Sequence, residues 1–319
     1  MKKLIPIAVA TALLLTACGS GNYAATQLPA EPAPTTTSAA PATPSTCDKS
    51  TELQSYKPDG PLPAPMQMKP GTTMAKIQAR GRLIAGVSAD SLHLGSRNPL
   101  SGQIEGFDID MLKAVATAIF GTDKGHLELR VISSPQRIPV LKDNSVDIVA
   151  RNMTINCVRW QQIAFSAEYY LSGQKTLVQR DSKATGLGDL SGKTVCAPAG
   201  STSLDNLKKK NPKIKPVTAD SDTGCLVLFQ QGKADAISGD DTVLAGDAAQ
   251  DPYAKVLPER ISNEPYGLGI NIANSDFVRF VNGVLEQMKA SGAWMTSYRT
   301  WLEPALGKLP APPTPAYGR

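Results

Sequence analysis

The alternation of strand-like and helix-like segments is the feature that most constrains the fold of this chain. Between about residues 71 and 304, short apolar runs alternate with segments whose apolar residues recur at helical spacing. Strands are predicted at 83–87, 127–132, 146–150, 194–197 and 235–239, and helices at 74–78, 106–119 and 276–292. Such alternation is typical of α/β proteins with mainly parallel sheets covered by helices. A stretch of this length is sufficient for two lobes.

The N-terminus carries the signals of an exported protein. Residues 1–3 are basic, and residues 4–15 are apolar but too short to span a bilayer. We therefore interpret residues 1–17 as a signal peptide. Leu15–Gly19 resembles a bacterial lipobox, in which Cys18 is lipidated and becomes the mature N-terminus. An ordinary signal peptide that contains a cysteine is the alternative. We expect an extracytoplasmic protein that a lipid anchor attaches to the cell membrane.

Two segments beside the central region contain few residues that could form a core. Residues 18–70 are rich in Ala, Pro, Thr and Ser, a composition that buries too little apolar surface to offset chain entropy. We expect this segment to be a flexible tether that follows the lipidated cysteine. Residues 305–319 form a Pro-rich tail that we expect to be extended.

Four cysteines remain when Cys18 is set aside. They are Cys47, Cys157, Cys196 and Cys225, and an even number in an oxidising compartment indicates two disulfides. Four cysteines allow three pairings. We favour Cys196–Cys225, which lie in one predicted lobe, and Cys47–Cys157. A free thiol at Cys157 is the alternative for the second pair.

The composition argues against several classes of function. The net charge is only +5, the single basic run is Lys208–Lys210, and aromatic residues make up 5% of the chain. A surface that binds nucleic acid would need more cations and more aromatic side chains, so we expect none. With two histidines and no His/Cys cluster at ligand spacing, we expect neither a metal site nor a cofactor.

Five motifs then occur along the central region in a fixed order. They are Gly106-Phe107-Asp108-Ile109-Asp110; Asp147–Asn156 with Arg159 and Phe165-Ser166; Leu190–Val195 with Gly200-Ser201-Thr202; Gly232–Ala236 with Asp240; and Tyr266-Gly267-Leu268. In this order they resemble the extracytoplasmic amino-acid-binding proteins of ABC importers, which form solute-binding protein family 3.

That resemblance implies a particular architecture. It is the type II fold of periplasmic binding proteins, in which two lobes, each a mainly parallel sheet flanked by helices, are joined by a two-segment hinge. We place lobe 1 at 71–176 and 266–304, and lobe 2 at 177–265.

The resemblance also implies how a free amino acid is held at its two charged ends. Arg159 would bind the carboxylate with its guanidinium, and Thr154 would offer a backbone N–H and a hydroxyl. Asp240, from the other lobe, would accept the ammonium group. A ligand that bridges the lobes in this way favours their closure, because only the closed state satisfies both ends.

Three further polar residues are predicted to contribute to this site. Ser201 and Thr202 lie in a loop at a predicted helix N-terminus, where free N–H groups favour anions. Asn152 can supply an acceptor. Taken singly, such residues could instead be helix caps or surface groups.

Two additional arginines bear on the ligand's side chain. Ser134–Pro139, which contains Arg137, and the loop position of Arg97 resemble the glutamate- and aspartate-binding branch of the family. The run Asp240–Gly246 resembles the same branch. An acidic side chain that enters a closed cleft needs charge partners, which these arginines would supply. Alternatively, both arginines bond loop carbonyls or aspartates, and glutamine and asparagine remain open as ligands.

One departure from the family pattern concerns the cover of the site. The loop Asn98-Pro99-Leu100 lacks the aromatic residue that the family usually places over the ligand.

A binding protein is the function that these features favour. We expect a monomer that presents a small acidic amino acid, or its amide, to a membrane-embedded ABC permease or to a membrane sensor. A dehydratase-like enzyme on the same fold is the alternative. Such an enzyme would need a poised acid or base, and His93 is the only histidine near a predicted site loop.

Overall fold

The computed structural model describes residues 48–319. The predicted signal peptide, Cys18 and Cys47 lie outside these residues. Among the described residues, no helix combines the length and the apolarity that a membrane crossing requires.

Helices and strands alternate along the chain as predicted. The strands are β1 (Leu83–Val87), β2 (Asp90–Ser91), β3 (Gly95–Arg97), β4 (Ile104–Glu105), β5 (Leu127–Val131), β6 (Ile148–Ala150), β7 (Ile163–Phe165), β8 (Tyr170–Gln179), β9 (Thr194–Pro198), β10 (Lys215–Ala219), β11 (Ala236–Asp240), β12 (Ala254–Val256), β13 (Ser262–Tyr266) and β14 (Gly269–Asn271). The α-helices are α1 (Thr73–Arg80), α2 (Phe107–Phe120), α3 (Pro139–Lys142), α4 (Cys157–Trp160), α5 (Thr202–Lys210), α6 (Asp222–Gln230), α7 (Asp241–Gln250), α8 (Ser275–Ser291), α9 (Ala293–Trp301) and α10 (Glu303–Leu306). Short 3-10 turns form at Lys49–Thr51, Pro135–Arg137 and Leu187–Leu190.

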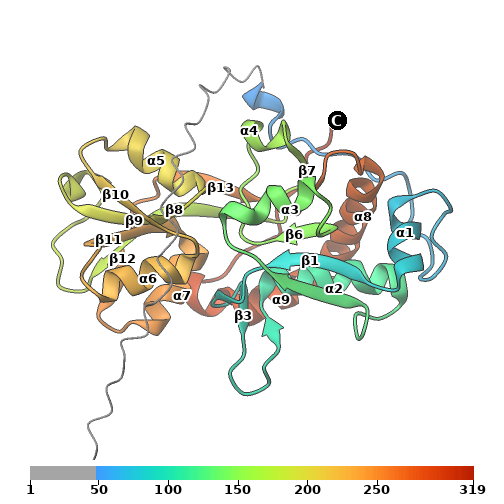
Figure 1. The fold of residues 1–319 in the computed structure, drawn as a ribbon, viewed down its shortest axis with the longest axis horizontal. Helices are drawn as coiled ribbons and strands as arrows, with labels where there is room; N and C mark the ends of the chain where they lie inside the picture. The colour runs from blue at the N-terminus through green and yellow to red at the C-terminus, as the bar shows by residue number, and fades with distance from the viewer. Residues whose placement is uncertain (1–47) are drawn as a thin grey trace, which may run out of the picture. The chain divides into compact units, whose positions relative to one another are not determined.

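Two sheets organise the described chain (Figure 1). The first has the strand order β5-β1-β6-β14-β7, and the second has the order β10-β9-β11-β8-β12, with β13 also paired to β8. We call the parts built around these sheets lobe 1 and lobe 2. In Figure 1, lobe 2 with α5, α6 and α7 lies on the left, and lobe 1 with α1, α2, α8 and α9 lies on the right. The predicted two-lobe α/β fold is therefore confirmed.

Both sheets are mixed rather than mainly parallel. β1 pairs in parallel with β5 and β6, while β14 pairs antiparallel with β6 and β7. In lobe 2, β9 pairs in parallel with β10 and β11, while β8 pairs antiparallel with β11, β12 and β13. The antiparallel strands are those nearest the two crossings, because a chain that returns from one lobe to the other must run against the strand on which it left.

Two neighbouring segments connect the lobes. The chain first crosses between β7 and β8, and it returns between β13 and β14. The crossings are bonded to one another, since the Tyr169 N–H donates to the Tyr266 carbonyl at 2.9 Å and the Ser166 N–H donates to Leu268 at 2.9 Å. β8 begins at Tyr170 and belongs to the second sheet, ahead of the predicted lobe boundary at residue 176.

Each lobe has its own apolar core. In lobe 1, Phe107 of α2 and Trp294 of α9 are fully buried and contact each other edge to face, with ring centroids 5.5 Å apart. In lobe 2, separate clusters cover the two faces of the sheet, one of them around Val195 and Leu207 and the other around Phe229 and Leu244.

Residues 48–70, predicted to belong to the tether, pack against lobe 1. Ser55 is fully buried, and its hydroxyl donates to the Phe165 carbonyl at 2.8 Å. Met68 is also buried, at the lobe 1 core. Composition alone missed this, because a few anchoring residues suffice to hold a Pro-rich segment whose other side chains face water. The tail pairs with the same segment through a bridge between Tyr317 and Ser55.

Candidate functional site

A small, nearly filled cavity lies between the two lobes. Lobe 1 and lobe 2 both contribute to its walls. The lining residues are Ser134, Arg137, Asn152, Thr154, Arg159, Pro198, Ser201, Thr202, Ser203, Asp222, Gly239 and Asp240. The structure thus brings together all the residues predicted to bind ligand except Arg97.

Arg159 reaches the cavity from α4, a single helical turn. Asn156 caps this turn, because its side-chain oxygen accepts a hydrogen bond from the Arg159 N–H at 2.9 Å. The guanidinium donates from Nη1 to the Thr154 carbonyl at 2.7 Å and from Nη2 to the Gly200 carbonyl at 3.2 Å. Gly200 belongs to lobe 2, so Arg159 links the lobes. Burial lowers the pKa of Arg159, although nearby carboxylates, Glu264 first, oppose this effect.

Arg137 reaches the same cavity from the 3-10 turn before α3. Its guanidinium donates to the carbonyls of Ser134, Arg151 and Asn152 in lobe 1, and from Nη2 to Gly200 in lobe 2 at 3.2 Å. Burial lowers the pKa of Arg137 to about 9, with further contributions from the charges of Arg159 and Arg151. An anion placed in the cavity would relieve this repulsion.

Gly200 is the point at which both arginines meet lobe 2. Its φ of +67° is in the left-handed region, and a Cβ there would lie 3.4 Å from the Cα of Pro135. The positive φ makes glycine the favoured residue for the turn before α5, whereas the contact with Pro135 would itself accommodate a Cβ.

A third arginine, Arg151, lies directly behind the cavity. It is 1% exposed, and its Nη1 lies 3.7 Å from Oδ2 of Asp222 in lobe 2. The same Asp222 oxygen accepts hydrogen bonds from the Ser91 hydroxyl at 3.0 Å and from the Asn152 amide at 3.4 Å. Asp222 is therefore already paired with lobe 1 groups.

Asp240 lies on the lobe 2 side, where β11 ends and α7 begins. Its Oδ2 accepts a hydrogen bond from the Tyr266 hydroxyl at 2.7 Å. Burial raises the pKa of Asp240 well above its usual range, and the neighbouring carboxylate of Glu264 raises it further. A cation in the cavity would favour the ionised form of this carboxyl.

Two threonines, one from each lobe, share hydrogen bonds to one carboxylate. The hydroxyls of Thr154 and Thr202 lie 3.3 Å apart, and both donate to Oε2 of Glu264, at 2.7 and 2.6 Å. Thr202 is the first residue of α5, and Ser201 caps that helix by accepting from the Leu204 N–H at 3.1 Å. The helix N-terminus therefore faces the cavity, where its dipole favours an anion.

Asn152 is unusual in two respects. Its φ is +38°, a backbone conformation that asparagine tolerates better than most residues. Within residues 48–319, its buried Oδ1 accepts no hydrogen bond, whereas its N–H donates to Asp108 at 2.9 Å. A lining acceptor without a partner suits a ligand that brings its own donor.

Arg97 was predicted to reach the ligand side chain, but it lies outside the cavity. It is exposed in the β3–β4 hairpin, where its Nη1 donates to the Gly102 carbonyl at 2.6 Å. The alternative interpretation, that this arginine bonds a loop carbonyl, describes it correctly. His93 is not among the lining residues either.

Sequence reasoning missed Asp222, Ser134 and Glu264. Asp222 follows Ser221 at the start of α6, a capping pattern common to many helices that carry no ligand. Ser134 stands three residues before Arg137, within a motif that was recognised only for its arginine. Glu264 precedes Pro265 in a segment that shows no strand pattern, although β13 forms there.

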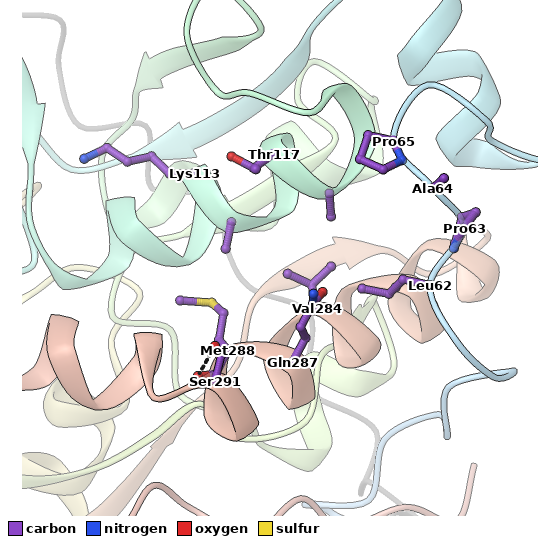
Figure 2. A pocket seen from close by; sticks show the side chains of 12 residues that line it. Leu62, Pro63, Ala64, Pro65, Lys113, Thr117, Val284, Gln287, Met288 and Ser291 are labelled. Atoms are coloured by element: carbon purple, nitrogen blue, oxygen red, sulfur yellow. Dashed lines mark hydrogen bonds between the residues drawn. The ribbon is translucent and has the colours of Figure 1, made fainter.

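A second and larger hollow, of about 540 Å³, lies elsewhere on lobe 1. In Figure 2, side chains of α2 and of α8 form two of its walls, and residues 62–65 form a third. Lys113 is its only charged lining residue, and Leu62, Val284 and Met288 are apolar. It thus lacks the opposed charges of the cavity between the lobes.

One predicted disulfide is present, and the second concerns a residue outside the described chain. Cys196 and Cys225 are bonded, and they join β9 to α6 within lobe 2. Cys157 is also disulfide-bonded, and its expected partner Cys47 is not among residues 48–319. The alternative prediction, that Cys157 carries a free thiol, is therefore wrong.

Known proteins resemble this chain over most of its described part. It is 39% identical over 198 residues to the glutamine-binding protein of Geobacillus stearothermophilus, a match that covers 62% of this chain and 75% of that protein. It is 30% identical to the glutamate-binding protein GluB of Corynebacterium efficiens over 72% of this chain and 80% of that protein.

Solved structures have the same fold. A mutant of the arginine-binding protein of T. maritima superposes with a TM-score of 0.67 at 30% identity. The match covers 72% of this chain and 99% of that one. Residues 83–304 match the model of the bacterial extracellular solute-binding proteins, family 3. The chain therefore belongs to this family of extracellular solute-binding proteins and is not an enzyme.

Proposed function

We propose that this protein captures a free acidic amino acid, glutamate or aspartate, by closing its two lobes around it, and presents the ligand to an ABC permease or a membrane sensor. The ligand would occupy the cavity between the lobes. Arg159, Thr154 and the N-terminus of α5 would hold its carboxylate. Asp240 and the free oxygen of Asn152 would hold its ammonium group.

The placement of opposite charges on the two walls of one cavity carries this proposal. Arg159 and Arg137 from lobe 1 and Asp240 from lobe 2 are all buried, and all three line the cavity. A zwitterion offers a group of opposite charge to each wall, which offsets the cost of burying these side chains. An uncharged sugar or an inorganic anion would satisfy one wall at most.

Arg137 is the reason to favour an acidic side chain. Arg159 suffices for one carboxylate, and Arg151 is paired with Asp222. Arg137 makes only hydrogen bonds to neutral carbonyls among the contacts given above, so its charge remains available for a second carboxylate. Burial of a carboxylate without such a partner would cost several kcal/mol, which an arginine at this position offsets.

Glutamine is the second candidate ligand. The relative that is 39% identical is called a glutamine-binding protein. A side-chain amide could donate to the carbonyls around Arg137 and accept from its guanidinium. Neutral groups would then leave the arginine charge without compensation, which is why we rank the acid first.

Calorimetric titration of the mature protein with L-glutamate, L-aspartate, L-glutamine and L-asparagine tests this proposal. We expect the acids to bind at least about tenfold more tightly than their amides, a difference of about 1.4 kcal/mol. Tighter binding of the amides would overturn the choice of an acidic ligand. Absence of binding by all four would overturn the function itself.

Attachment to the membrane through Cys18 is a further part of the proposal. It follows from the lipobox resemblance and accords with the extracellular family. A Cys18→Ala variant should appear in the culture medium or in the aqueous phase of a detergent partition, while the wild type stays with membranes. Equal partition of both would contradict the anchor.

A further inference from the structure

The two ends of the described chain pair with each other on the outside of lobe 1. The Ser55 N–H donates to the Ala316 carbonyl at 2.9 Å, and the Gly318 N–H donates back to the Ser55 carbonyl at 3.1 Å. Arg319, the last residue, donates from Nε to the Gln54 carbonyl at 2.7 Å and from Nη2 to Thr51 at 3.2 Å. We call residues 51–55 together with residues 316–319 the terminal clasp.

The clasp is fixed to the core of lobe 1. The buried Ser55 hydroxyl donates to Phe165 at the end of β7. The side chain of Asn282, in α8, donates to the same hydroxyl at 2.9 Å. The clasp is therefore a built part of the lobe and not a loosely attached end.

The other side of the clasp lies on α4. The Trp160 indole N–H donates to the Glu52 carbonyl at 2.8 Å, and the Cys157 N–H donates to the Glu52 carboxylate at 3.3 Å. The guanidinium of Arg319 lies 4.1 Å from the centre of the Trp160 ring, a cation–π contact. In Figure 1 the chain accordingly ends near α4 and β7.

α4 needs such support because it is short and carries a buried charge. A four-residue turn is not stable as an isolated helix. Its Arg159 must nevertheless aim a guanidinium at a ligand, where a small displacement weakens bidentate binding strongly. Trp160 is adjacent to Arg159 in sequence, so whatever fixes the indole also fixes the backbone from which the arginine extends.

We propose that the terminal clasp positions Arg159, and that Arg319 and Glu52 thereby set the affinity for the ligand's α-carboxylate without touching the ligand. This inference rests on the function proposed above. It assigns a binding role to the last residues of the chain, which by composition form a Pro-rich tail. The disulfide at Cys157 holds the same turn covalently and acts in the same direction.

A double-mutant cycle between Arg319 and Arg159 tests the clasp. The dissociation constant is measured by calorimetry for the wild type, Arg319→Ala, Arg159→Lys and the double variant, with whichever of the four amino acids above binds the wild type most tightly. We expect Arg319→Ala to weaken binding roughly five- to tenfold. In the Arg159→Lys background the same change should cost less than twofold, because the geometry it protects is already lost.

Arg130→Ala is the matched control. Arg130 is also an exposed arginine of lobe 1 that donates to a carboxylate and a carbonyl, those of Glu128 at 2.9 Å and Ser145 at 2.6 Å, but it lies on β5 and contacts neither the clasp nor α4. This control should leave the dissociation constant within twofold of the wild type. Hydrogen exchange of residues 157–161 should become faster in Arg319→Ala and stay unchanged in Arg130→Ala.

The outcomes separate this inference from the function on which it rests. A wild type that binds none of the four amino acids removes both. A wild type that binds, combined with an unchanged constant in Arg319→Ala, removes the clasp alone. Equal losses in both backgrounds of the cycle also overturn a positioning role for Arg319. So does weaker binding that a melting experiment traces to global unfolding.

Discussion

Lobe 1 and lobe 2 contribute different kinds of side chain to the cavity they share. Lobe 1 supplies Arg137 and Arg159, with Arg151 directly behind them, all three buried. Lobe 2 supplies Asp222, Asp240 and the N-terminus of α5. Like charges repel within each wall, and Arg151 and Asp222 form an ion pair across the gap. Under the function proposed above, a ligand that carries both signs of charge would complete the closure.

Removal of a lobe 1 cation should have the largest effect on this balance. Arg159→Ala should weaken amino-acid binding by about 3–5 kcal/mol, since it leaves a carboxylate in a closed cavity without its partner. Calorimetry measures the change directly. A dissociation constant close to that of the wild type would end the assignment of Arg159 to the carboxylate.

Removal of the lobe 2 acid should have the next largest effect and should also change the pH dependence. Because burial raises the pKa of Asp240, the unliganded carboxyl is protonated above the usual range, and the ligand's ammonium favours its ionisation. Wild-type affinity should therefore rise with pH until Asp240 ionises without ligand. Asp240→Asn should bind about 2–3 kcal/mol more weakly and respond less to pH. Identical pH profiles for both proteins would contradict this.

Arg137 is the lobe 1 residue that we propose distinguishes acidic ligands from their amides. Arg137→Gln should weaken binding of L-glutamate by about 1–2 kcal/mol more than binding of L-glutamine, because only the acid loses a charge partner. The comparison requires titration of both ligands with both proteins. If glutamate and glutamine lose affinity equally, Arg137 does not contact the ligand side chain.

Asp247 tests the repulsion among buried carboxylates around Asp222 from a position that does not line the cavity. Burial raises the pKa of Asp247, with further contributions from Asp222 and Asp90, and within the described chain its Oδ2 has no hydrogen-bond partner. A raised pKa in the folded state means that wild-type stability falls as the pH rises from the usual aspartate range through the raised value. Asp247→Asn should be more stable by about 1–2 kcal/mol at neutral pH. This advantage should vanish toward pH 4 in urea unfolding experiments, and a constant difference would contradict it.

Arg97 should have the smallest effect. It is exposed and bonds its own hairpin, so Arg97→Ala should change the affinity by less than about 0.5 kcal/mol. A loss that is selective for acidic ligands would show that the hairpin does reach the cavity when ligand binds.

The sequence predicted the elements that neighbouring residues determine, and it missed those that depend on contacts with distant parts of the chain. β1 at 83–87 was predicted with its observed bounds, because five consecutive buried residues give a strong apolar run. β8 was missed, since its ten residues alternate irregularly between polar and apolar and are buried by both sheet neighbours and helices. Antiparallel pairing near the crossings also left no trace in the periodicity.

The residues in and around the cavity show the same limit. Arg159 and Asp240 were placed together because each stands in a recognisable motif. Arg97 was predicted in the site from a resemblance in sequence position. That resemblance does not determine whether the β3–β4 hairpin folds over the cavity, and Arg97 does not line it. Glu264, 2% exposed and bonded to two threonines from different lobes, could be found only when the lobes are assembled.

The bond between Cys196 and Cys225 bears on how selectivity is divided between the lobes. It ties the strand that leads to Pro198 and Ser201 to the helix that starts at Asp222, so these two edges of the cavity cannot part independently. The lobe 2 side of the cavity would then keep the same shape for every solute that binds. Adaptation among solutes of different length would fall to the arginine loops of lobe 1, and that is where changes of preference between relatives should be sought first.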